Sequence, residues 1–343
     1  MRKIAQVVRR YGPVGGMEKY VWELSRELAK RGHPVTVVCE RQLCEDFPGI
    51  EVHETGPIRQ RPRWLSLLRF SKRVEAFFAD RPDFLIHSHE RLGIHHVTTF
   101  HGPPFATILE KPWWKRISLR VRMQLMLERR EVMTPQIVVP NSPLISDLLA
   151  RHYPAARLSA PVPPGVEPGE ARPARRPPPE GGVIGFVGKE WKRKNLAWAI
   201  SVAERLAATR PGIRLRIYGP EPSEIGALLS SAGIDCAAMG WKGRPDYASM
   251  DLLIHPARSE PYGMVVAEAL ASRVPVVISD RCGIAPYLKA DMGEVLDLEE
   301  SLDAWAAACE RQLCRDESPS PLVRRWEDVT DDYEKIYLEL EKP

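Results

Sequence analysis

The sequence has no long apolar run and no C-x-x-C pair among its 343 residues. Charged residues interrupt every hydrophobic stretch well before the roughly 18 residues that a membrane-spanning helix needs. The start Met1-Arg-Lys leads directly into an apolar run, so we expect neither a signal peptide nor a transmembrane helix. The six scattered cysteines argue against a disulfide framework and a zinc site. We therefore expect a cytoplasmic protein with reduced thiols.

The common nucleotide fingerprints are also missing. No G-x-G-x-x-G follows the first apolar run, which removes the signature of a dinucleotide cofactor. No G-x-x-x-x-G-K-[ST] motif for a nucleoside triphosphate is present either. The net charge of +4 is too mild to indicate nucleic-acid binding, and no such motif accompanies it. We expect no nucleic-acid partner.

What the sequence does contain is a repeated alternation of short apolar runs and helical patterns. We predict strands at residues 3–8, 34–39, 50–53, 84–87, 97–100 and 137–139, and again at 183–187, 214–218, 251–255 and 274–278. This alternation predicts an α/β fold with mostly parallel sheets covered by helices. The connection between the strands at 84–87 and 97–100 is too short for a full helical crossover, so the topology is open there.

A proline-rich stretch divides the pattern into two halves. Residues 161–182 are rich in proline and poor in apolar residues, and we interpret them as a linker. The prediction is two tandem Rossmann-like doubly wound domains, at residues 1–160 and 183–318, facing a cleft. Residues 319–343 have helical periodicity and are expected to pack back on the first domain. Ligands of such sheets bind at the carboxyl ends of the strands.

Two loops at predicted strand ends suit an anion. Gly15 and Gly16 precede a helix, whose free amides favour a phosphate, although a turn that simply needs glycine explains them equally well. In GFVGKEWKRKN, Gly188 ends a buried strand and a run of cations follows it. These cations, Lys189, Lys192, Arg193 and Lys194, favour a diphosphate site over the alternative of a solvated charged loop.

The segment SEPYGMVVAE places two carboxylates around a turn and the start of a helix. Glu260 lies just before the helix and Glu268 lies within it, so they are not a proton-sharing pair. Each carboxylate can accept hydrogen bonds from neighbouring sugar hydroxyls, while the amides of residues 262–264 face a phosphate. The alternative is a capping role for Glu260 and a solvated position for Glu268. The apolar character of the helix makes an unpaired Glu268 costly.

Taken together, these motifs resemble the retaining GT-B glycosyltransferases, which use nucleotide sugars. The E-x7-E pattern, the FVG…K…K loop, GPVGGME, TFHG, PGVE and the closing RRWEDVTDDYEKIY helix carry the resemblance over essentially the whole chain. Lipopolysaccharide-core glucosyltransferases and related cell-surface glycan enzymes are the most similar group. The resemblance implies a hexosyl transfer from a nucleoside-diphosphate sugar, with UDP favoured, to a glycan or glycolipid, without a metal or other cofactor.

The resemblance also implies roles for individual residues. The catalytic residues that it implies are Lys189, Lys194, Glu260 and His101. The donor-binding residues that it implies are Gly15, Gly16, Gly188, Tyr262, Gly263, Met264, Val265 and Glu268. The family more often has arginine where this chain has Lys189, and its PGVE segment usually ends in aspartate. Two alternatives stay open: a GT-B nucleotide-sugar epimerase, and a nucleotide-sugar-binding protein without catalysis.

Two further features allow other ligands. Five histidines lie between residues 87 and 101, but spacing alone does not establish a metal site, and we expect none. Residues 111–130 mix tryptophans with lysines and arginines. This segment is either a core helix with solvated arginines or an interfacial helix on anionic lipid. We favour peripheral contact with an anionic membrane, on its cytoplasmic face.

Overall fold

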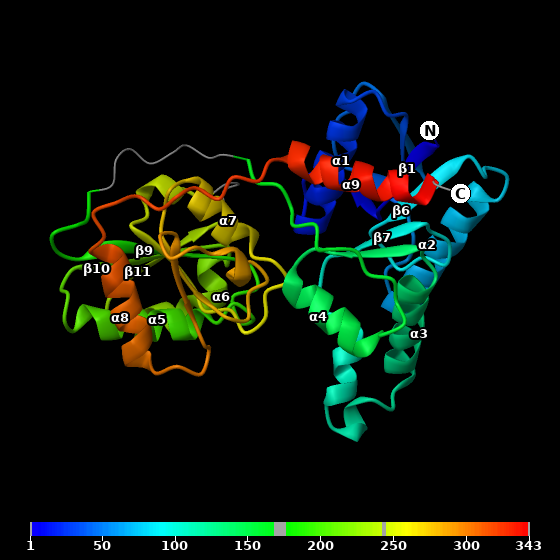
Figure 1. The fold of residues 1–343 in the computed structure, drawn as a ribbon. Helices are drawn as coiled ribbons and strands as arrows, with labels where there is room; N and C mark the ends of the chain where they lie inside the picture. The colour runs from blue at the N-terminus through cyan, green and yellow to red at the C-terminus, as the bar shows by residue number, and fades with distance from the viewer. Residues whose placement is uncertain (1, 168–175, 242–244, 342–343) are drawn as a thin grey trace. The chain divides into compact units, whose positions relative to one another are not determined.

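The computed structural model describes residues 2–167, 176–241 and 245–341 of the chain (Figure 1). The chain divides into two compact units, each with its own core: unit 1 is Met1–Gly165 with Arg324–Pro343, and unit 2 is Val166–Val323. Part of the predicted linker, residues 168–175, lies outside the described residues. The predicted α/β class with two Rossmann-like domains is confirmed.

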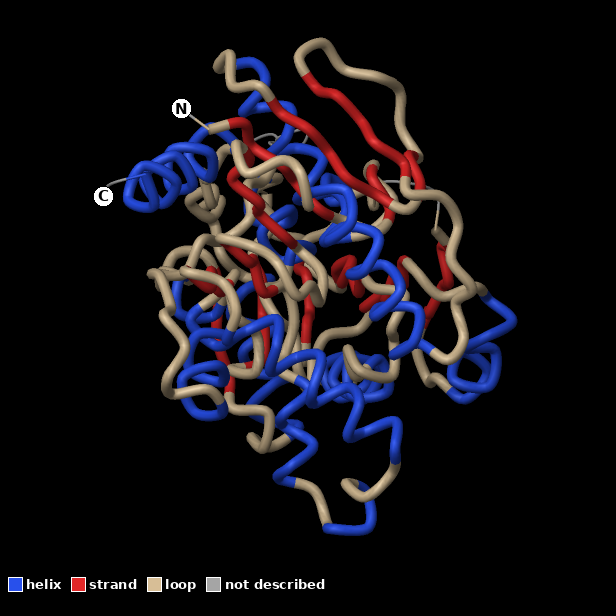
Figure 2. The backbone as a smooth tube through the Cα atoms, turned by 90° about the vertical axis from the view of Figure 1, so that its right-hand side faces the viewer, coloured by secondary structure: helices blue, strands red, loops and turns tan. Residues whose placement is uncertain are grey.

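Unit 1 is built on a six-stranded parallel sheet in the order β5-β3-β1-β6-β7-β8, with helices packed around it (Figure 2). The strands are β1 (Lys3–Val7), β3 (Val35–Cys39), β5 (Ile50–Glu54), β6 (Phe84–Ser88), β7 (Val97–Phe100) and β8 (Ile137–Pro140). The helices are α1 (Gly16–Lys30), α2 (Arg63–Phe78), α3 (Leu119–Met133), α4 (Pro143–His152) and α9 (Trp326–Glu341). A small ladder pairs β2 (Arg10–Tyr11) with β4 (Arg41–Gln42).

The short connection between β6 and β7 does not break the parallel sheet. His87 pairs with Val97 and Ser88 pairs with Thr98 in parallel register. The connecting loop carries no described helix, and backbone bonds hold it against the strands, with His96 donating to the Ile86 carbonyl. Parallel neighbours can therefore be joined here without a helical crossover, which settles the topology that the sequence left open.

The C-terminal helix is shorter than the predicted segment at 319–343. It begins at Trp326, and residues 321–325 before it are not helical. Its apolar face packs on α1, where the rings of Tyr20 and Trp326 meet edge to face at 5.2 Å (Figure 1). The helix therefore belongs to the core of unit 1, although it ends the sequence.

Unit 2 is built on a second six-stranded parallel sheet in the order β11-β10-β9-β12-β13-β14. The strands are β9 (Gly182–Val187), β10 (Ile213–Tyr218), β11 (Asp235–Gly240), β12 (Leu252–His255), β13 (Val276–Ser279) and β14 (Gly293–Leu296). The helices are α5 (Leu196–Ala207), α6 (Pro222–Ser231), α7 (Met264–Ala271) and α8 (Leu302–Leu313). The sequence analysis missed β11 and β14, both at sheet edges, because neither is a continuous run of buried apolar residues.

Each sheet has one place where the strand order reverses. In unit 1 this point lies between β1 and β6, and in unit 2 it lies between β9 and β12. The loops that follow these strands diverge to opposite sides, which leaves a crevice at the carboxyl edge of the sheet. The two reversal points therefore locate the candidate ligand sites, one in each unit.

Of the helices in the described part of the chain, none combines the length and the apolar character that crossing a bilayer requires.

Candidate functional site

In unit 2, the loops after β9 and β12 are joined to each other and to the loop after β13. The Arg258 amide donates to the Arg193 carbonyl at 3.0 Å, which ties the β12 loop to the β9 loop. The Glu260 amide donates to the Arg281 carbonyl at 3.0 Å, and its own carbonyl accepts from the Gly283 amide at 2.9 Å. The backbone therefore fixes the position of Glu260 at the reversal point of the sheet.

A buried ion pair lies between these loops. Lys194 Nζ is 3.2 Å from Glu260 Oε2, and each side chain is only 11% exposed. Arg193 Nη1 and His255 Nε2 each lie 3.4 Å from the same carboxylate oxygen. The structure thus brings together two of the predicted catalytic residues, Lys194 and Glu260, and adds Arg193 and His255 to them.

The electrostatics keep Glu260 charged. Burial alone would raise the pKa of Glu260, but the Lys194 ammonium, His255 and Arg193 outweigh it and hold the pKa well below its usual range. Burial, followed by the Lys194 charge, lowers the pKa of His255 and keeps its ring neutral. The site is therefore a fixed arrangement of two cations around one carboxylate, with the cations in excess.

Gly188 makes room for the lysine. Its φ of +152° favours glycine, and an added Cβ would lie 2.1 Å from Lys194 Cδ. The Lys194 stem therefore crosses directly over the Gly188 backbone on its way to Glu260. A glycine is therefore needed at position 188 for two reasons: the Lys194 side chain leaves no room for a Cβ, and the backbone φ is positive.

We expect Gly188→Ala to lower kcat/KM by about 100-fold, because a lysine displaced by about 1 Å no longer meets its target. The strained backbone should also lower the free energy of unfolding by about 1–3 kcal/mol. Steady-state kinetics and urea denaturation measure the two effects. Gly226→Ala in α6 is the control, because open space surrounds that position and alanine favours a helix. Equal kinetics for the two variants would contradict the role of Gly188.

The other cations of the β9 loop point elsewhere. Lys189 Nζ lies over the ring of Trp241 at 4.6 Å, and Lys192 Nζ lies over the ring of Trp191 at 5.0 Å. No hydrogen bond or ion pair joins Lys189 to Glu260 within the part of the chain that the structure describes. Of the two lysines predicted to be catalytic, Lys194 therefore pairs with Glu260, and Lys189 makes no described contact with it.

The predicted donor-binding residues at α7 lie in a turn and the first helical turns. Gly263 precedes α7 with a φ of +112°, in the left-handed region. The backbone amides of Met264 and Val265 have no hydrogen-bond partner among the described residues, and they form the start of the helix. Tyr262 is buried beside them. Such amides can donate to a phosphate oxygen.

Glu268 is a separate group in α7. Its side chain is half-buried, and its Oε2 accepts a hydrogen bond from the Tyr247 hydroxyl at 2.7 Å. Tyr247 is buried, so the hydroxyl holds the carboxylate in one orientation. The second carboxylate oxygen accepts no described hydrogen bond from a side chain. This oxygen is therefore available to a ligand hydroxyl.

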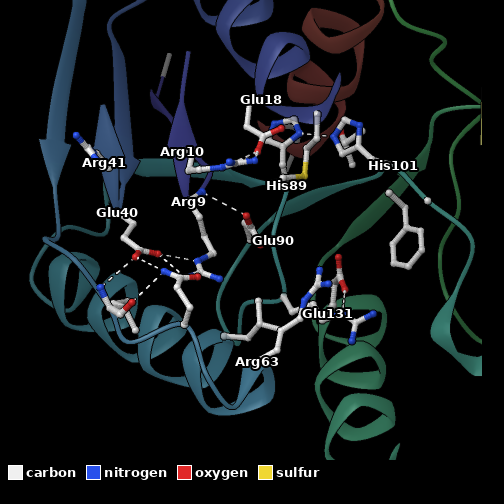
Figure 3. A pocket seen from close by; sticks show the side chains of 18 of the residues that line it. Arg9, Arg10, Glu18, Glu40, Arg41, Arg63, His89, Glu90, His101 and Glu131 are labelled. Atoms are coloured by element: carbon white, nitrogen blue, oxygen red, sulfur yellow. Dashed lines mark hydrogen bonds and ion pairs between the residues drawn. The ribbon is translucent and has the colours of Figure 1, made fainter. Parts of the chain in front are cut away.

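In unit 1, the carboxyl edge of the sheet opens into a cavity of about 1100 Å³ at the β1/β6 reversal point (Figure 3). Charged side chains from several loops line it. The arginines are Arg9, Arg10, Arg41, Arg61, Arg63 and Arg91, and the glutamates are Glu18, Glu40, Glu54, Glu90 and Glu131. The sequence analysis assigned no site to these residues.

Carboxylates engage only half of these arginines. Arg9 Nε donates to Glu40 Oε2 at 2.8 Å and Arg10 Nε donates to Glu18 Oε1 at 3.0 Å, as Figure 3 shows. Arg91 Nε lies 3.3 Å from Glu131 Oε2. For the guanidinium groups of the remaining three, Arg41, Arg61 and Arg63, the described residues provide no hydrogen bond or ion pair.

Two of the glutamates are partly neutral. Burial raises the pKa of Glu90 to about 7, although the Arg9 charge opposes it. Burial likewise raises the pKa of Glu131 to about 8, against the charge of Arg91. At neutral pH the cavity therefore carries more unopposed positive than negative charge, and it suits an anionic ligand.

The predicted residues of unit 1 lie close to this cavity. Gly15 and Gly16 begin α1, and the Glu18 carboxylate folds back over Gly15, where a ligand anion was expected. His101 lines the cavity, and its Nε2 lies 2.8 Å from His89 Nδ1. Burial lowers the pKa of His101 to about 3, so its ring is neutral. Within the described residues, no three His, Cys, Asp or Glu side chains are arranged to hold a metal ion.

Sequence reasoning missed three contributors to these sites. His255 was read only as the end of a strand, Arg193 only as one cation among four, and Tyr247 not at all. The position of His255 at the carboxyl end of a buried strand is the signal that could have identified it. Nothing in the sequence near Tyr247 indicates its contact with Glu268.

Comparisons with known proteins cover both units. Residues 14–170 match the family described as Glycosyltransferase Family 4, and residues 181–315 match the family described as Glycosyl transferases group 1. Among curated proteins, the D-inositol 3-phosphate glycosyltransferase of Segniliparus rotundus is 25% identical over 86% of this chain and 75% of its own. That of Acidothermus cellulolyticus is 28% identical over 81% of this chain and 73% of its own.

Solved structures show the same fold. WaaG, a glycosyltransferase involved in lipopolysaccharide biosynthesis, superposes with a TM-score of 0.77 at 20% identity, covering 97% of this chain and 95% of that one. The sucrose-phosphate synthase of Thermosynechococcus elongatus has a TM-score of 0.78 at 18% identity, and the match covers 99% of both chains. The crystal structure of HepE of Anabaena in complex with UDP-glucose has a TM-score of 0.70 at 14% identity. The match covers 99% of this chain and 100% of that one.

Proposed function

Because the chain belongs to the glycosyltransferases of the GT-B fold, we propose that it moves a hexose, with retention, from a nucleoside-diphosphate sugar to a glycan or glycolipid. A UDP-sugar is the favoured donor, and the reaction needs no metal or other cofactor. The observation that carries the proposal is the buried Lys194–Glu260 pair at the strand reversal of unit 2. The crystallised complex of HepE with UDP-glucose adds support for the donor class.

Unit 2 is proposed to hold the donor through three groups. Lys194 and the amides of Met264 and Val265 bind the diphosphate, since they supply positive charge beside unpaired N–H donors. Glu260 accepts hydrogen bonds from hydroxyls of the transferred sugar. Glu268, oriented by Tyr247, accepts them from the ribose.

The main catalytic demand is the charge that develops on the leaving diphosphate as the anomeric bond breaks. Lys194 meets this demand, and its pairing with a carboxylate preorganises it before the donor binds. The acceptor hydroxyl attacks from the face of departure and passes its proton to a phosphate oxygen. In this proposal no carboxylate acts as a general base.

The acceptor is proposed to be an anionic glycan or glycolipid, as in lipopolysaccharide or other cell-surface polysaccharide biosynthesis. The cavity of unit 1 supports this class, because Arg41, Arg61 and Arg63 line it without a carboxylate partner among the described residues. Guanidinium groups bind phosphates and carboxylates through paired hydrogen bonds. The curated relatives, whose names specify an inositol phosphate, point to an anionic acceptor as well.

A thermal-shift screen over nucleotide sugars tests the donor class first, since a ligand of the native state raises its melting temperature. The donor that gives the largest shift is then incubated with anionic and neutral glycolipid acceptors, and NMR of the product reads the anomeric configuration. An inverted product would contradict retention. Donor breakdown without any transfer product from the full acceptor panel would contradict the glycosyltransferase assignment.

We expect Glu268→Ala to weaken donor binding by about tenfold, because one or two hydrogen bonds to a charged acceptor are lost. The effect should appear in KM for the donor, with kcat changed by less than about threefold. Tyr247→Phe should reproduce part of the loss, because it removes only the group that orients Glu268. Steady-state kinetics with varied donor measures both. A fall in kcat without a change in donor KM would contradict this role.

The segment before α3 exposes apolar and basic side chains together. It was expected to be one helix over residues 111–130, but only the part from Leu119 is α-helical, after the short 3-10 turns Phe105–Glu110 and Trp113–Lys115. The turns leave Trp113 66% and Trp114 59% exposed, with Ile117 exposed beside them. Lysines and arginines surround these residues. We propose that the segment rests on an anionic membrane surface.

Replacing Arg120 and Arg122 by glutamate is expected to lower the fraction of protein bound to vesicles rich in anionic lipid by about tenfold or more. The reason is that each cation near such a surface contributes about 1 kcal/mol of binding free energy. Co-sedimentation with anionic and neutral vesicles measures it. The control reverses the exposed Arg214 and Lys289 of unit 2, with the same change in net charge. Trp113→Ser with Trp114→Ser should reduce binding to both vesicle types. Binding indifferent to lipid charge and to all these changes would refute the membrane contact.

A further inference from the structure

Glu90 lies in the unit 1 cavity without a cation of its own. It follows β6 at the strand reversal of the sheet, and the residue is half-buried. Its carboxylate forms no ion pair among the residues that the structure describes. The single hydrogen bond that it accepts from them comes from the Arg9 backbone amide, 3.3 Å from Oε1, as Figure 3 shows. The proposed function gives this carboxylate no role.

Two arginines beside Glu90 in the fold are held by other carboxylates. Arg9 follows β1, the strand next to β6, and its Nε donates to Glu40 Oε2 at 2.8 Å. Arg91 follows Glu90 in the sequence, but its Nη2 lies 2.9 Å from Glu128 Oε2. Neither guanidinium can neutralise Glu90 unless it leaves a partner that it already has. The charge of Glu90 is therefore poorly compensated.

These surroundings decide the protonation of Glu90. Burial raises its pKa to about 7. The charges of Arg9 and Arg63 oppose this rise, and the charge of Glu18 adds to it. Near pH 7, Glu90 is therefore present both as a carboxylate and as a neutral acid.

The other titratable groups of the cavity change less near pH 7. Burial lowers the pKa of His89 and of His101, so both rings are neutral. Burial raises the pKa of Glu131 to about 8, so this residue is mostly protonated until the pH is higher. The arginines keep their charge throughout. The remaining glutamates of the cavity have an arginine partner or lie exposed: Glu18, Glu40 and Glu54.

An anion in this cavity would act on Glu90. Arg41, Arg61 and Arg63 are exposed there, and their guanidinium groups have no partner among the described residues. Guanidinium groups bind the oxygens of phosphate and sulfate. The charge of Arg63 already acts on Glu90, so an oxyanion bound to Arg63 brings a second negative charge into range. A nearby like charge favours the protonated form of a carboxyl group.

We propose that the unit 1 cavity binds an oxyanion of the phosphate or sulfate class together with one proton, which Glu90 carries and donates to the anion in a hydrogen bond. Glu90 Oε2 accepts no described hydrogen bond and is not among the fully buried oxygens without a partner, so a ligand reaches it. That the anion belongs to the acceptor glycan rests on the proposed function, and acceptor binding then weakens as the pH rises above neutrality. The proton linkage does not rest on that function.

Sulfate is the probe for this linkage, because its charge is constant over the pH range used and any pH dependence of its binding comes from the protein. Calorimetry on the full chain gives Kd and, from two buffers of different ionisation enthalpy, the number of protons taken up. We expect Kd to rise by close to about tenfold per pH unit above about pH 7, with about half a proton taken up at pH 7 and about one at pH 8. Binding without proton uptake, or no binding at millimolar sulfate, would overturn the proposal.

Glu90→Gln isolates the proton. Its amide oxygen keeps the contact with the Arg9 amide, and its NH2 group donates in place of the protonated carboxyl. We expect one Kd for sulfate between about pH 6 and 8, about tenfold lower than that of the native protein at pH 8. Loss of the pH dependence in Glu131→Gln but not in Glu90→Gln would assign the proton to Glu131 and contradict the proposal.

Glu51→Gln is the matched control. It removes the same charge from an exposed position of β5 outside the cavity, and it should keep the native pH dependence. The calorimetric proton uptake of the native protein decides the matter if Glu90→Gln does not fold.

Arg63→Ala tests where the sulfate binds. Arg63 begins α2 and lines the cavity, so its loss should raise Kd by about tenfold or more at about pH 6. Arg69→Ala removes the same charge from an exposed position of the same helix outside the cavity, and it should change Kd by less than about twofold. Equal Kd values for the two variants would place the sulfate elsewhere and overturn the proposal.

A panel of sulfated hexoses separates a glycan-borne anion from a free one. At least one member should bind about tenfold more tightly than sulfate, because its hydroxyls add hydrogen bonds, and Glu90→Gln should remove the pH dependence of its binding as well. If every member binds as sulfate does, the cavity takes a free oxyanion and the acceptor assignment fails, although the proton linkage stands. None of these measurements uses a nucleotide sugar, so a failure of the proposed donor leaves their outcome unchanged.

Discussion

Replacing Lys194 by alanine is expected to lower kcat by about 10²–10³-fold, the loss typical of removing one group that stabilises developing negative charge. The ammonium lies 3.2 Å from Glu260 and is oriented before any donor binds, so no other side chain can take its place without moving. Arg193, the nearest cation, is held by Glu190 at 2.6 Å. Single-turnover kinetics at saturating donor separates this step from binding.

Lys192→Ala is the matched control for this experiment. It removes the same charge from the same loop, but its ammonium lies over Trp191 and makes no described contact with Glu260. We expect a change of less than about threefold in kcat, in line with the small effects of exposed charges. Lys194→Met, which keeps most of the stem over Gly188, should lose as much activity as Lys194→Ala. Comparable losses in Lys192→Ala and Lys194→Ala would mean that only the net charge of the loop matters.

Glu260→Gln is expected to lower both activity and stability. The substitution leaves Lys194 buried without its counter-ion, and breaking such a buried pair from one side costs about 3–5 kcal/mol. Loss of the charged acceptor for the sugar hydroxyls should reduce kcat/KM by about 100-fold. Urea denaturation and steady-state kinetics measure the two effects. Glu190→Gln is the control, because Glu190 pairs with the same Arg193 at an exposed position.

The stability difference should depend on pH with a definite sign. The pKa of Glu260 is lower in the folded than in the unfolded chain, so its charge stabilises the fold at every pH above the unfolded value. This contribution is lost as the pH falls from the unfolded towards the folded pKa. The difference between native protein and Glu260→Gln should therefore be constant near pH 7 and smaller below about pH 4. A difference that grows on acidification would contradict the depressed pKa.

Much of the fold followed from local patterns. The apolar runs at 183–187 and 251–255 predicted β9 and β12 to within a residue, because buried parallel strands are short and continuously apolar. The edge strands β11 and β14 escaped notice, since half-exposed strands lack that signal. The start of α9 was predicted too early, at 319 instead of 326, because helical spacing alone gives an imprecise boundary.

The candidate sites were only partly predictable. Lys189 and Lys194 are equivalent in the sequence, as cations after the same strand, but one lies on Trp241 and the other meets Glu260. That choice depends on a glycine over which only the Lys194 stem passes, and on a carboxylate supplied by a distant loop. The arginine-lined cavity was missed for a similar reason, because its residues come from loops that only the sheet brings together.

The sequence by itself determined the α/β class, the two-part organisation and the loops that carry the chemistry, because strand periodicity, turns and charge runs are properties of neighbouring residues. Only the tertiary structure decided which cation pairs with Glu260 and which arginines of the unit 1 cavity have no carboxylate partner among the described residues. The physical reason is that ion pairs depend on partners far along the chain, such as Lys194 for Glu260.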